Sequence, residues 1–179
     1  MDHATLLRLL LAADPAQAAC GFRTTFADGE IGETGTLRYL ATDRWILDVD
    51  HGGRTVSTPH GSWYVGRDGE LRKSVPTTPS FGSAVALLLP RYRGIEGAPG
   101  DDWTLDPSVP VTDSTTDGRI RAVFRHTEHP TYQAEATIHP TLHSILTLRT
   151  PAWVAELVNL RTDLTESELG EMESLFNQM

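Results

Sequence analysis

Short segments of alternating apolar and polar residues dominate the chain, and the most informative run covers residues 35–74. This run contains roughly four or five strand-like segments, separated by turn sequences at residues 51–53 and 68–69. Within residues 44–50, Trp45, Leu47 and Val49 share one side of an extended chain, and Ile46 lies on the other side with charged neighbours. The pattern predicts an antiparallel meander with a large apolar face.

A second meander follows in the C-terminal half. Apolar residues alternate with polar ones in residues 119–125, 132–138 and 142–148, and residues 153–160 form a last strand-like segment. Together the two meanders predict roughly nine or ten strands joined by short turns. Because an open sheet of that width tends to curl, we expect it to curl around the helices.

Three segments carry helical signals. Residues 3–13 place leucines on one stripe, and residues 80–89 are apolar on nearly every side, with Ser80 as the expected N-cap. Residues 165–177 begin with a capping box, in which Thr165 and Glu168 pair, while Leu164 and Leu169 occupy the hydrophobic-staple positions. We expect the apolar helix 80–89 to be covered on all sides.

The elements together predict an α+β fold: one large curved antiparallel sheet, an open half-barrel, that wraps two or three helices. A chain of 179 residues is expected to form a single domain over residues 1–179. Residues 91–116 are rich in Gly, Pro and Asp and predict a long loop around Trp103, with a short strand near residues 109–112. A loop of that length is a candidate lid or functional loop.

The balance of acidic and basic residues argues against two classes of binding partner. The net charge is −9, from 24 acidic and 15 basic residues. This acidic balance argues against nucleic acid, whose binding requires clustered cations, and against adsorption to anionic membranes. No stretch approaches the ~18–20 apolar residues of a membrane-spanning helix.

Cysteine usage and the N-terminal residues favour a cytoplasmic location. The single cysteine, Cys20, forms no intrachain disulfide, which fits a reducing compartment. The leucine-rich N-terminus superficially resembles a signal peptide. However, Asp2 stands where a basic region is usual, Arg8 interrupts the apolar run, and Gln17 stands where a lipoprotein cleavage box has an aliphatic residue. A secreted lipoprotein is therefore disfavoured.

Histidines near two turns raise the question of a metal site. His126 and His129 flank one turn, and His139 and His143 flank the next, so the pairs could converge on adjacent strands. Exposed hairpin-end histidines are the preferred interpretation. A metal-dependent hydrolase using His126, Glu128 and His129 is the weakest functional hypothesis.

Other catalytic signals are at background level. No Gly-x-Ser-x-Gly elbow occurs, Cys20 has no base close in sequence, and Asp101-Asp102 lies in a polar loop. The glycine pairs lack the strand–loop–helix context of a phosphate-binding loop. We therefore expect no catalytic residue, no metal and no cofactor, although an enzyme is not excluded.

Five short segments form a recognisable set: residues 6–10 (LLRLL) before the first strand, residues 35–39 (GTLRY), Arg44-Trp45 opening the next strand, residues 61–64 (GSWY) after a turn, and residues 136–146. In this order they resemble the LolA/LolB-like lipoprotein carriers and lipid-binding lipoproteins. In the last segment, residues 139–142 (HPTL) replace the acid and glycine that the family carries at that turn. The resemblance implies an open half-barrel that shields an acyl chain or another apolar segment, without catalytic residues.

The candidate ligand-binding residues follow from the apolar face and the apolar helix. Packing in a filled core and lining of a cavity are both consistent with the sequence. The first hypothesis is noncatalytic binding of a hydrophobic ligand, a lipid or acyl chain, or of an apolar polypeptide segment. The alternative is a cytoplasmic protein–protein interaction or regulatory module with a filled core. The residues expected to line the site are Tyr39, Trp45, Leu47, Trp63, Leu87 and Leu88.

Overall fold

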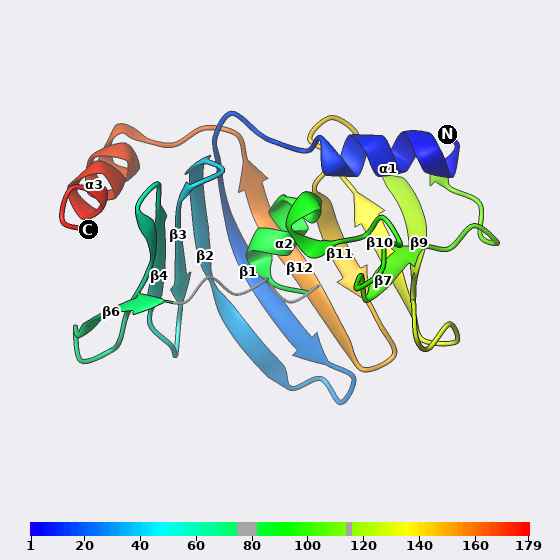
Figure 1. Ribbon diagram of the computed structural model, residues 1–179, viewed down its shortest axis with the longest axis horizontal. Helices are drawn as coiled ribbons and strands as arrows, with labels where there is room; N and C mark the ends of the chain where they lie inside the picture. Colours follow the sequence, from blue (N-terminus) through cyan, green and yellow to red (C-terminus); the bar gives the residue numbers. More distant parts are fainter. Residues whose placement is uncertain (75–81, 114–115) are drawn as a thin grey trace. The chain divides into compact units, whose positions relative to one another are not determined.

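The computed structural model describes residues 1–74, 82–113 and 116–179 (Figure 1). The helices are α1 (His3–Leu11), α2 (Ala84–Leu88) and α3 (Glu166–Phe176), with a 3-10 turn η1 (Pro90–Arg93). The strands are β1 (Ala18–Phe26), β2 (Ile31–Ala41), β3 (Arg44–Val49), β4 (Arg54–Thr58), β5 (Gly61–Val65), β6 (Leu71–Ser74), β7 (Trp103–Leu105), β8 (Thr112–Asp113), β9 (Ile120–His126), β10 (Gln133–Ile138), β11 (Ile145–Arg149) and β12 (Trp153–Arg161).

All strands of the described residues belong to one 12-stranded sheet. Its order is β6-β5-β4-β3-β2-β1-β12-β11-β10-β9-β7, and β8 also pairs with β9. The strands at the two ends of this order do not pair with each other, so the sheet is open. The predicted α+β class, with a large open antiparallel sheet and helices, is confirmed. No helix of the described residues is long and apolar enough to cross a membrane.

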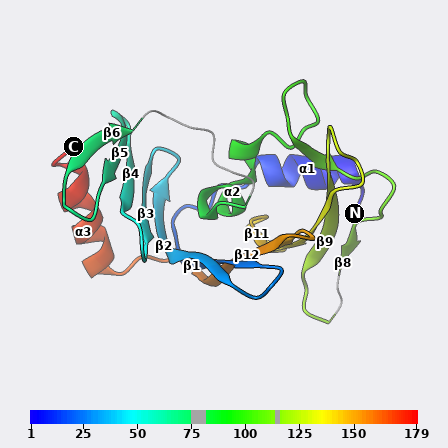
Figure 2. The ribbon, with the colours of Figure 1, turned by 90° about the horizontal axis from the view of Figure 1, so that it is seen from below.

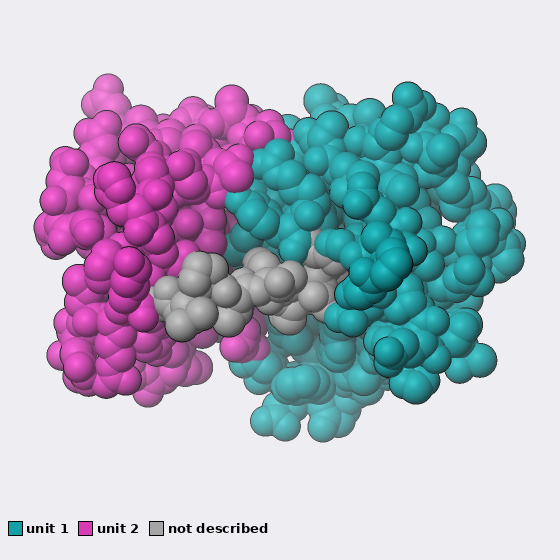
Figure 3. Space-filling model, viewed as in Figure 1, with its two compact units in different colours: residues 1–13, 24–32, 78–157 teal, residues 14–23, 33–77, 158–179 magenta. Residues whose placement is uncertain are grey.

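The chain forms two compact units, coloured separately in Figure 3. Unit 1 contains Met1–Ala13, Thr24–Gly32 and Thr78–Leu157, and unit 2 contains Asp14–Arg23, Glu33–Thr77 and Val158–Met179. The strands β1, β2 and β12 each contribute residues to both units. The prediction of a single domain therefore stays a prediction, and we describe each unit by itself.

The core of unit 1 is built around the two short helices. The Asp2 carboxylate caps α1 by accepting from the Thr5 N–H at 2.8 Å, and Leu6 and Leu10 of α1 are fully buried. Every residue of α2 is buried, and α2 packs against β11 (Figure 1). Ser83 caps α2, whereas the expected cap Ser80 lies outside the described residues.

The core of unit 2 lies between α3 and the strands β3 and β4. Figure 1 and Figure 2 both show α3 beside these strands. Ile46 and Val56 from the strands and Met172 from α3 are fully buried there. The predicted capping box of Thr165 and Glu168 is confirmed. Because the first turn of α3 carries its own cap, the helix starts where the sequence indicates.

The segment expected to be a long loop is anchored to the sheet of unit 1. Its Trp103 begins β7, is 5% exposed, and packs edge-on against His126 with 5.3 Å between ring centroids. The buried Asp106 carboxylate accepts from Ser108 and from the Gln133 side-chain amide at 2.8 Å. Through these contacts, Trp103 and Asp106 are packed at the edge of the sheet, where β7 is the last strand in the order.

Candidate functional site

The register of the strands divides the predicted lining residues between two faces of the sheet. Tyr39 pairs with Trp45, so these side chains share one face of β2 and β3. Arg38 pairs with Ile46, Ile46 with Val56, and Val56 with Trp63, which places Trp63 on the opposite face. Trp45 and Trp63 therefore lie on opposite faces of the sheet, because the turns between strands set their relative phase. Their part in ligand binding stays a prediction.

The first face, which we call the Trp45 face, carries Trp45, Leu47, Val49 and Tyr64. Trp45, Leu47 and Val49 are half-buried, and Tyr64 is 38% exposed. Leu47 pairs with Thr55 and Thr55 with Tyr64, so the aromatic ring of Tyr64 continues the same face. The result is a partly apolar surface, with Thr55 and Ser57 of β4 between the apolar residues of β3 and Tyr64 of β5, that keeps partial contact with solvent.

Tyr39 lies on this same side but is 1% exposed. Its hydroxyl donates to the Asp14 carboxylate, which satisfies the polar end of the buried ring. Tyr39 is therefore a buried residue of the Trp45 face and adds nothing to its exposed surface.

The opposite face of the same strands is covered by α3. Trp63 is partly buried there against the core of Ile46, Val56 and Met172. The ammonium group of Lys73, from the neighbouring strand β6, lies 5.7 Å from the centroid of the Trp63 ring. Trp63 thus packs beneath a helix in this structure.

Leu87 and Leu88 belong to unit 1, whereas the other four predicted lining residues belong to unit 2. Both leucines have 0% exposure, so no water-sized void touches them. The Ser144 hydroxyl, also fully buried, donates to the Leu88 carbonyl at 2.8 Å and ties the end of α2 to the sheet. Their part in ligand binding stays a prediction.

His126 and His139 each accept hydrogen bonds from the backbone of the turn that follows them. His126 Nδ1 accepts from the backbone N–H of Glu128 and of His129, at 3.2 and 3.3 Å. His139 Nδ1 accepts in the same way from Thr141 and Leu142, at 3.2 and 3.1 Å. Within the described residues, no group of three or more His, Cys, Asp or Glu is arranged to hold a metal ion.

Burial also shifts the pKa of two titratable groups, the Cys20 thiol and the His139 ring. Cys20 is 5% exposed, and burial raises the pKa of its thiol to about 12, which keeps it protonated and unreactive. His139 has a pKa below its usual value, first because of burial and then because His143 and Arg119 lie nearby.

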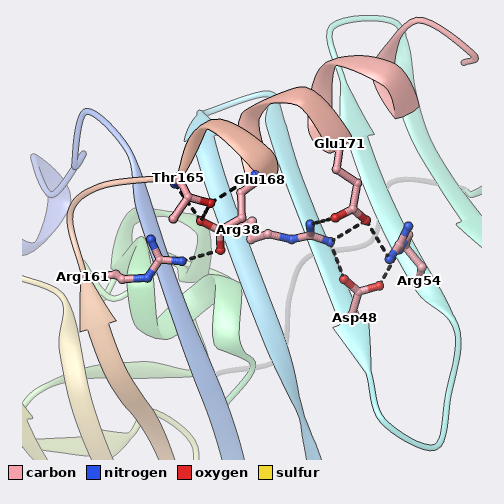
Figure 4. Close-up of polar contacts among 7 residues, drawn as sticks. All are labelled: Arg38, Asp48, Arg54, Arg161, Thr165, Glu168 and Glu171. Atoms are coloured by element: carbon pink, nitrogen blue, oxygen red, sulfur yellow. Dashed lines mark hydrogen bonds and ion pairs between the residues drawn. The ribbon is translucent and has the colours of Figure 1, made fainter.

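A charged cluster under α3 is the feature that sequence reasoning missed (Figure 4). Arg38 donates to Glu171 at 2.6 Å and to Asp48 at 2.7 Å, and Arg54 also contacts both carboxylates. Burial lowers the pKa of Arg38, but its hydrogen bonds to Glu171 and Asp48 outweigh burial and raise it. The cluster thus pairs two guanidinium groups with two carboxylates beneath the helix.

A second ion pair lies at the start of α3. Arg161 donates to Glu168, whose other oxygen accepts from the Thr165 backbone N–H at 2.8 Å. This backbone hydrogen bond is the main cause that lowers the pKa of Glu168. Beside the pair lies a pocket of about 340 Å³, lined by Ala19, Cys20, Gly21, Thr36, Leu37, Arg38, Asn159, Arg161 and Glu168.

One feature of the sequence could have indicated this region, since Asn159 stands within the last predicted strand and Asn adopts left-handed conformations more readily than most residues. In the structure its φ is 53°, within the otherwise extended β12. The charged residues themselves look solvent-facing in the sequence, because Arg38 and Asp48 occupy polar positions of their strands. With α3 docked, Arg38 is buried and Asp48 stays partly exposed.

Comparisons with known proteins identify the fold. No protein-family model matches the chain, and no curated protein matches it. A chain from the MucA/MucB complex of Pseudomonas aeruginosa matches 94% of this chain with a TM-score of 0.57 and 16% identity. This chain covers 60% of that longer chain.

Two further solved structures resemble this chain over almost its whole length. An uncharacterised conserved protein from Thermus thermophilus has a TM-score of 0.53 and 13% identity, with 93% of this chain and 91% of that chain covered. A domain described as an outer membrane lipoprotein-sorting protein, from Vibrio parahaemolyticus, has a TM-score of 0.42 and 9% identity, with 93% and 95% covered. At these identities the comparisons concern the fold alone, and the chain carries a weak resemblance to the LolA/LolB-like fold.

Proposed function

We propose that the protein is a noncatalytic binding protein that holds an apolar ligand on its Trp45 face. The observation that carries the proposal is the partial exposure of Trp45 and Leu47 beside the exposed Tyr64. Ligand sites are mostly apolar and aromatic, with a few fixed polar groups. The ligand class is a lipid or acyl chain, or an apolar segment of a polypeptide.

Saturable uptake of a fluorescent long-chain fatty acid by delipidated protein tests this proposal. Trp45→Ser and Leu47→Ser should each weaken binding at least about tenfold, equivalent to ~1.4 kcal/mol. Ile31→Asp is the matched control, since Ile31 is an apolar residue that is 60% exposed in unit 1. Absence of saturable uptake, or equal affinity in the Trp45→Ser variant, would reject an acyl ligand at this face.

A protein partner is the second candidate function. The structural neighbour from the MucA/MucB complex is part of an assembly of two proteins, which favours a polypeptide as the bound species. Purification of the tagged full chain from its native cells, followed by analysis of both extracted lipid and bound protein, separates the two candidates. A stoichiometric protein partner without lipid supports this second function.

We further propose that the protein acts in the cytoplasm. The buried, unpaired Cys20 is compatible with a reducing compartment. Fractionation of cells that produce the full-length protein with a C-terminal epitope tag tests the location. Recovery in an extracytoplasmic fraction would reject it.

A further inference from the structure

The contact between α3 and the sheet has a small apolar centre. Met172 is the one residue of α3 that is fully buried, and it meets Ile46 and Val56. The remaining apolar contacts on α3, at Leu169, Leu175 and Phe176, are only partly buried. Much of the fit therefore depends on the charges at the edges of the contact.

Ion pairs join the two sides of this contact, with arginines on the strands and glutamates on α3. The sheet side presents the cations Arg38, Arg54 and Arg161 together with one carboxylate, that of Asp48 (Figure 4). α3 presents Glu168 and Glu171, three residues apart on the helix. Residues at i and i+3 lie on one side of a helix, so both carboxylates reach the strands together. The surface is complementary to an acidic amphipathic helix.

Two buried donors under α3 have no acceptor. Among the described residues, the buried side-chain nitrogen or oxygen atoms without a hydrogen-bond partner are Arg38 Nε and Trp63 Nε1. Both side chains lie on the face that α3 covers, as the register of β2 to β5 shows. Leaving a buried donor unpaired is unfavourable, so α3 covers these groups at a penalty.

We propose that the face of β2 to β5 beneath α3 is a docking surface for an acidic amphipathic helix of a partner protein. α3 occupies this surface in the free protein. The partner helix repeats the acids of 168 and 171 and the buried apolar position of 172. At one or more of the partly buried positions 169, 175 and 176 it carries a side-chain acceptor, such as Gln, that reaches Trp63 Nε1 or Arg38 Nε. This surface is opposite the Trp45 face, and the inference goes beyond the proposed function.

The connection of α3 permits the exchange. α3 follows β12 through residues 162–165 and forms no part of the sheet ladder, so its departure breaks no strand pairing. A second copy of the chain is a less suitable occupant, because its identical α3 leaves the same two donors unpaired.

The experiment measures binding of a labelled peptide with the sequence of residues 163–179 to the full-length protein. Met172→Asp places a charge in the buried centre of the contact and should release α3. Glu168→Gln/Glu171→Gln releases it by removing the ion pairs and serves as the second variant. Each released protein should bind the peptide at least about tenfold more tightly than the wild type, in which the attached α3 competes at millimolar effective concentration. The control peptide, which itself carries Met172→Asp, should not bind.

The unpaired donors are tested with peptides that carry Gln in turn at 169, 175 and 176. At least one should bind the released protein more tightly than the α3 sequence does, and Trp63→Phe in the protein should remove that gain. If both variants fold, as far-ultraviolet circular dichroism can verify, and neither gains peptide affinity, the docking surface is refuted. Concentration-dependent dimerisation without peptide binding, or no gain from any Gln peptide, refutes the partner helix.

Discussion

At the scale of single residues, hydrogen bonds of polar side chains connect turns and loops to the core. The Tyr39 hydroxyl donates to Asp14, and the Ser144 hydroxyl donates to the Leu88 carbonyl. The Asp106 carboxylate accepts from Ser108 and Gln133. In each case a buried or half-buried polar group finds its partner far along the chain or across a turn. Satisfying such groups matters because an unpaired one costs more than the bond gains.

Ser144→Ala should destabilise the protein by about 1–3 kcal/mol, because the Leu88 carbonyl would stay buried without its donor. Urea unfolding measures the loss. The matched control is Ser174→Ala on the exposed side of α3, where a change below about 0.5 kcal/mol is expected for a surface position. Equal effects of both substitutions would contradict the role of the hydrogen bond.

The stability of the protein should fall as pH falls below about 6.5, the usual pKa of histidine. The folded state lowers the pKa of His139, chiefly through burial, so it favours the neutral ring that accepts from Thr141 and Leu142. This contribution is present above the unfolded pKa and is lost as pH falls through the folded one, since the unfolded state binds the proton more readily.

His139→Asn tests that pH dependence, because an Asn oxygen can accept from the same two amides without titrating. Urea unfolding at pH 7.5 and 5.5 should show a smaller loss in this variant than in the wild type. His51→Asn, at an exposed turn residue, should keep the wild-type loss. If the His139→Asn variant loses as much stability between pH 7.5 and 5.5 as the wild type does, groups other than His139 cause the loss.

At the scale of elements, α3 shows how a local signal and a tertiary contact combine. Its capping box starts the helix independently of the sheet, and Leu164 just before it is buried at 8% exposure. The face on which α3 docks follows from Ile46 and Val56, whose burial depends on the pairing of β3 with β4. The helix is thus encoded locally, whereas its position is encoded by the sheet.

Thr165→Ala should lower stability by about 0.5–2 kcal/mol through loss of the cap on the Glu168 N–H. Thermal unfolding followed by circular dichroism measures the change. Thr162→Ala, an exposed residue three positions earlier, is the control and should leave the midpoint unaltered. A Thr162→Ala effect of equal size would place the loss in the connection rather than in the cap.

At the scale of the whole molecule, the two units share the strands β1, β2 and β12. Unfolding either unit would remove residues of these strands from their pairing, so we expect the chain to unfold in one cooperative transition. This is the physical content of the single-domain prediction.

Calorimetry on the wild type and on Ile46→Ala and Phe124→Ala tests this expectation. Ile46 and Phe124 have 0% exposure in unit 2 and unit 1 respectively, and each substitution should cost about 2–5 kcal/mol. Both should move the same single peak to lower temperature. Two peaks, each moved by only one substitution, would show that the units are independent domains.

Alternation, helical stripes and capping residues act within a few positions, so the residues alone predict the class of the fold, the three helices and the start of α3. They also indicate which side of a single strand carries Trp45. Contacts between distant elements place Trp63 on the opposite face from Trp45, seal Leu87 and Leu88 in a core, and pair Arg38 with Asp48 and Glu171. No local pattern encodes these features, because the turns fix the phase between strands, and burial depends on which distant element covers a face.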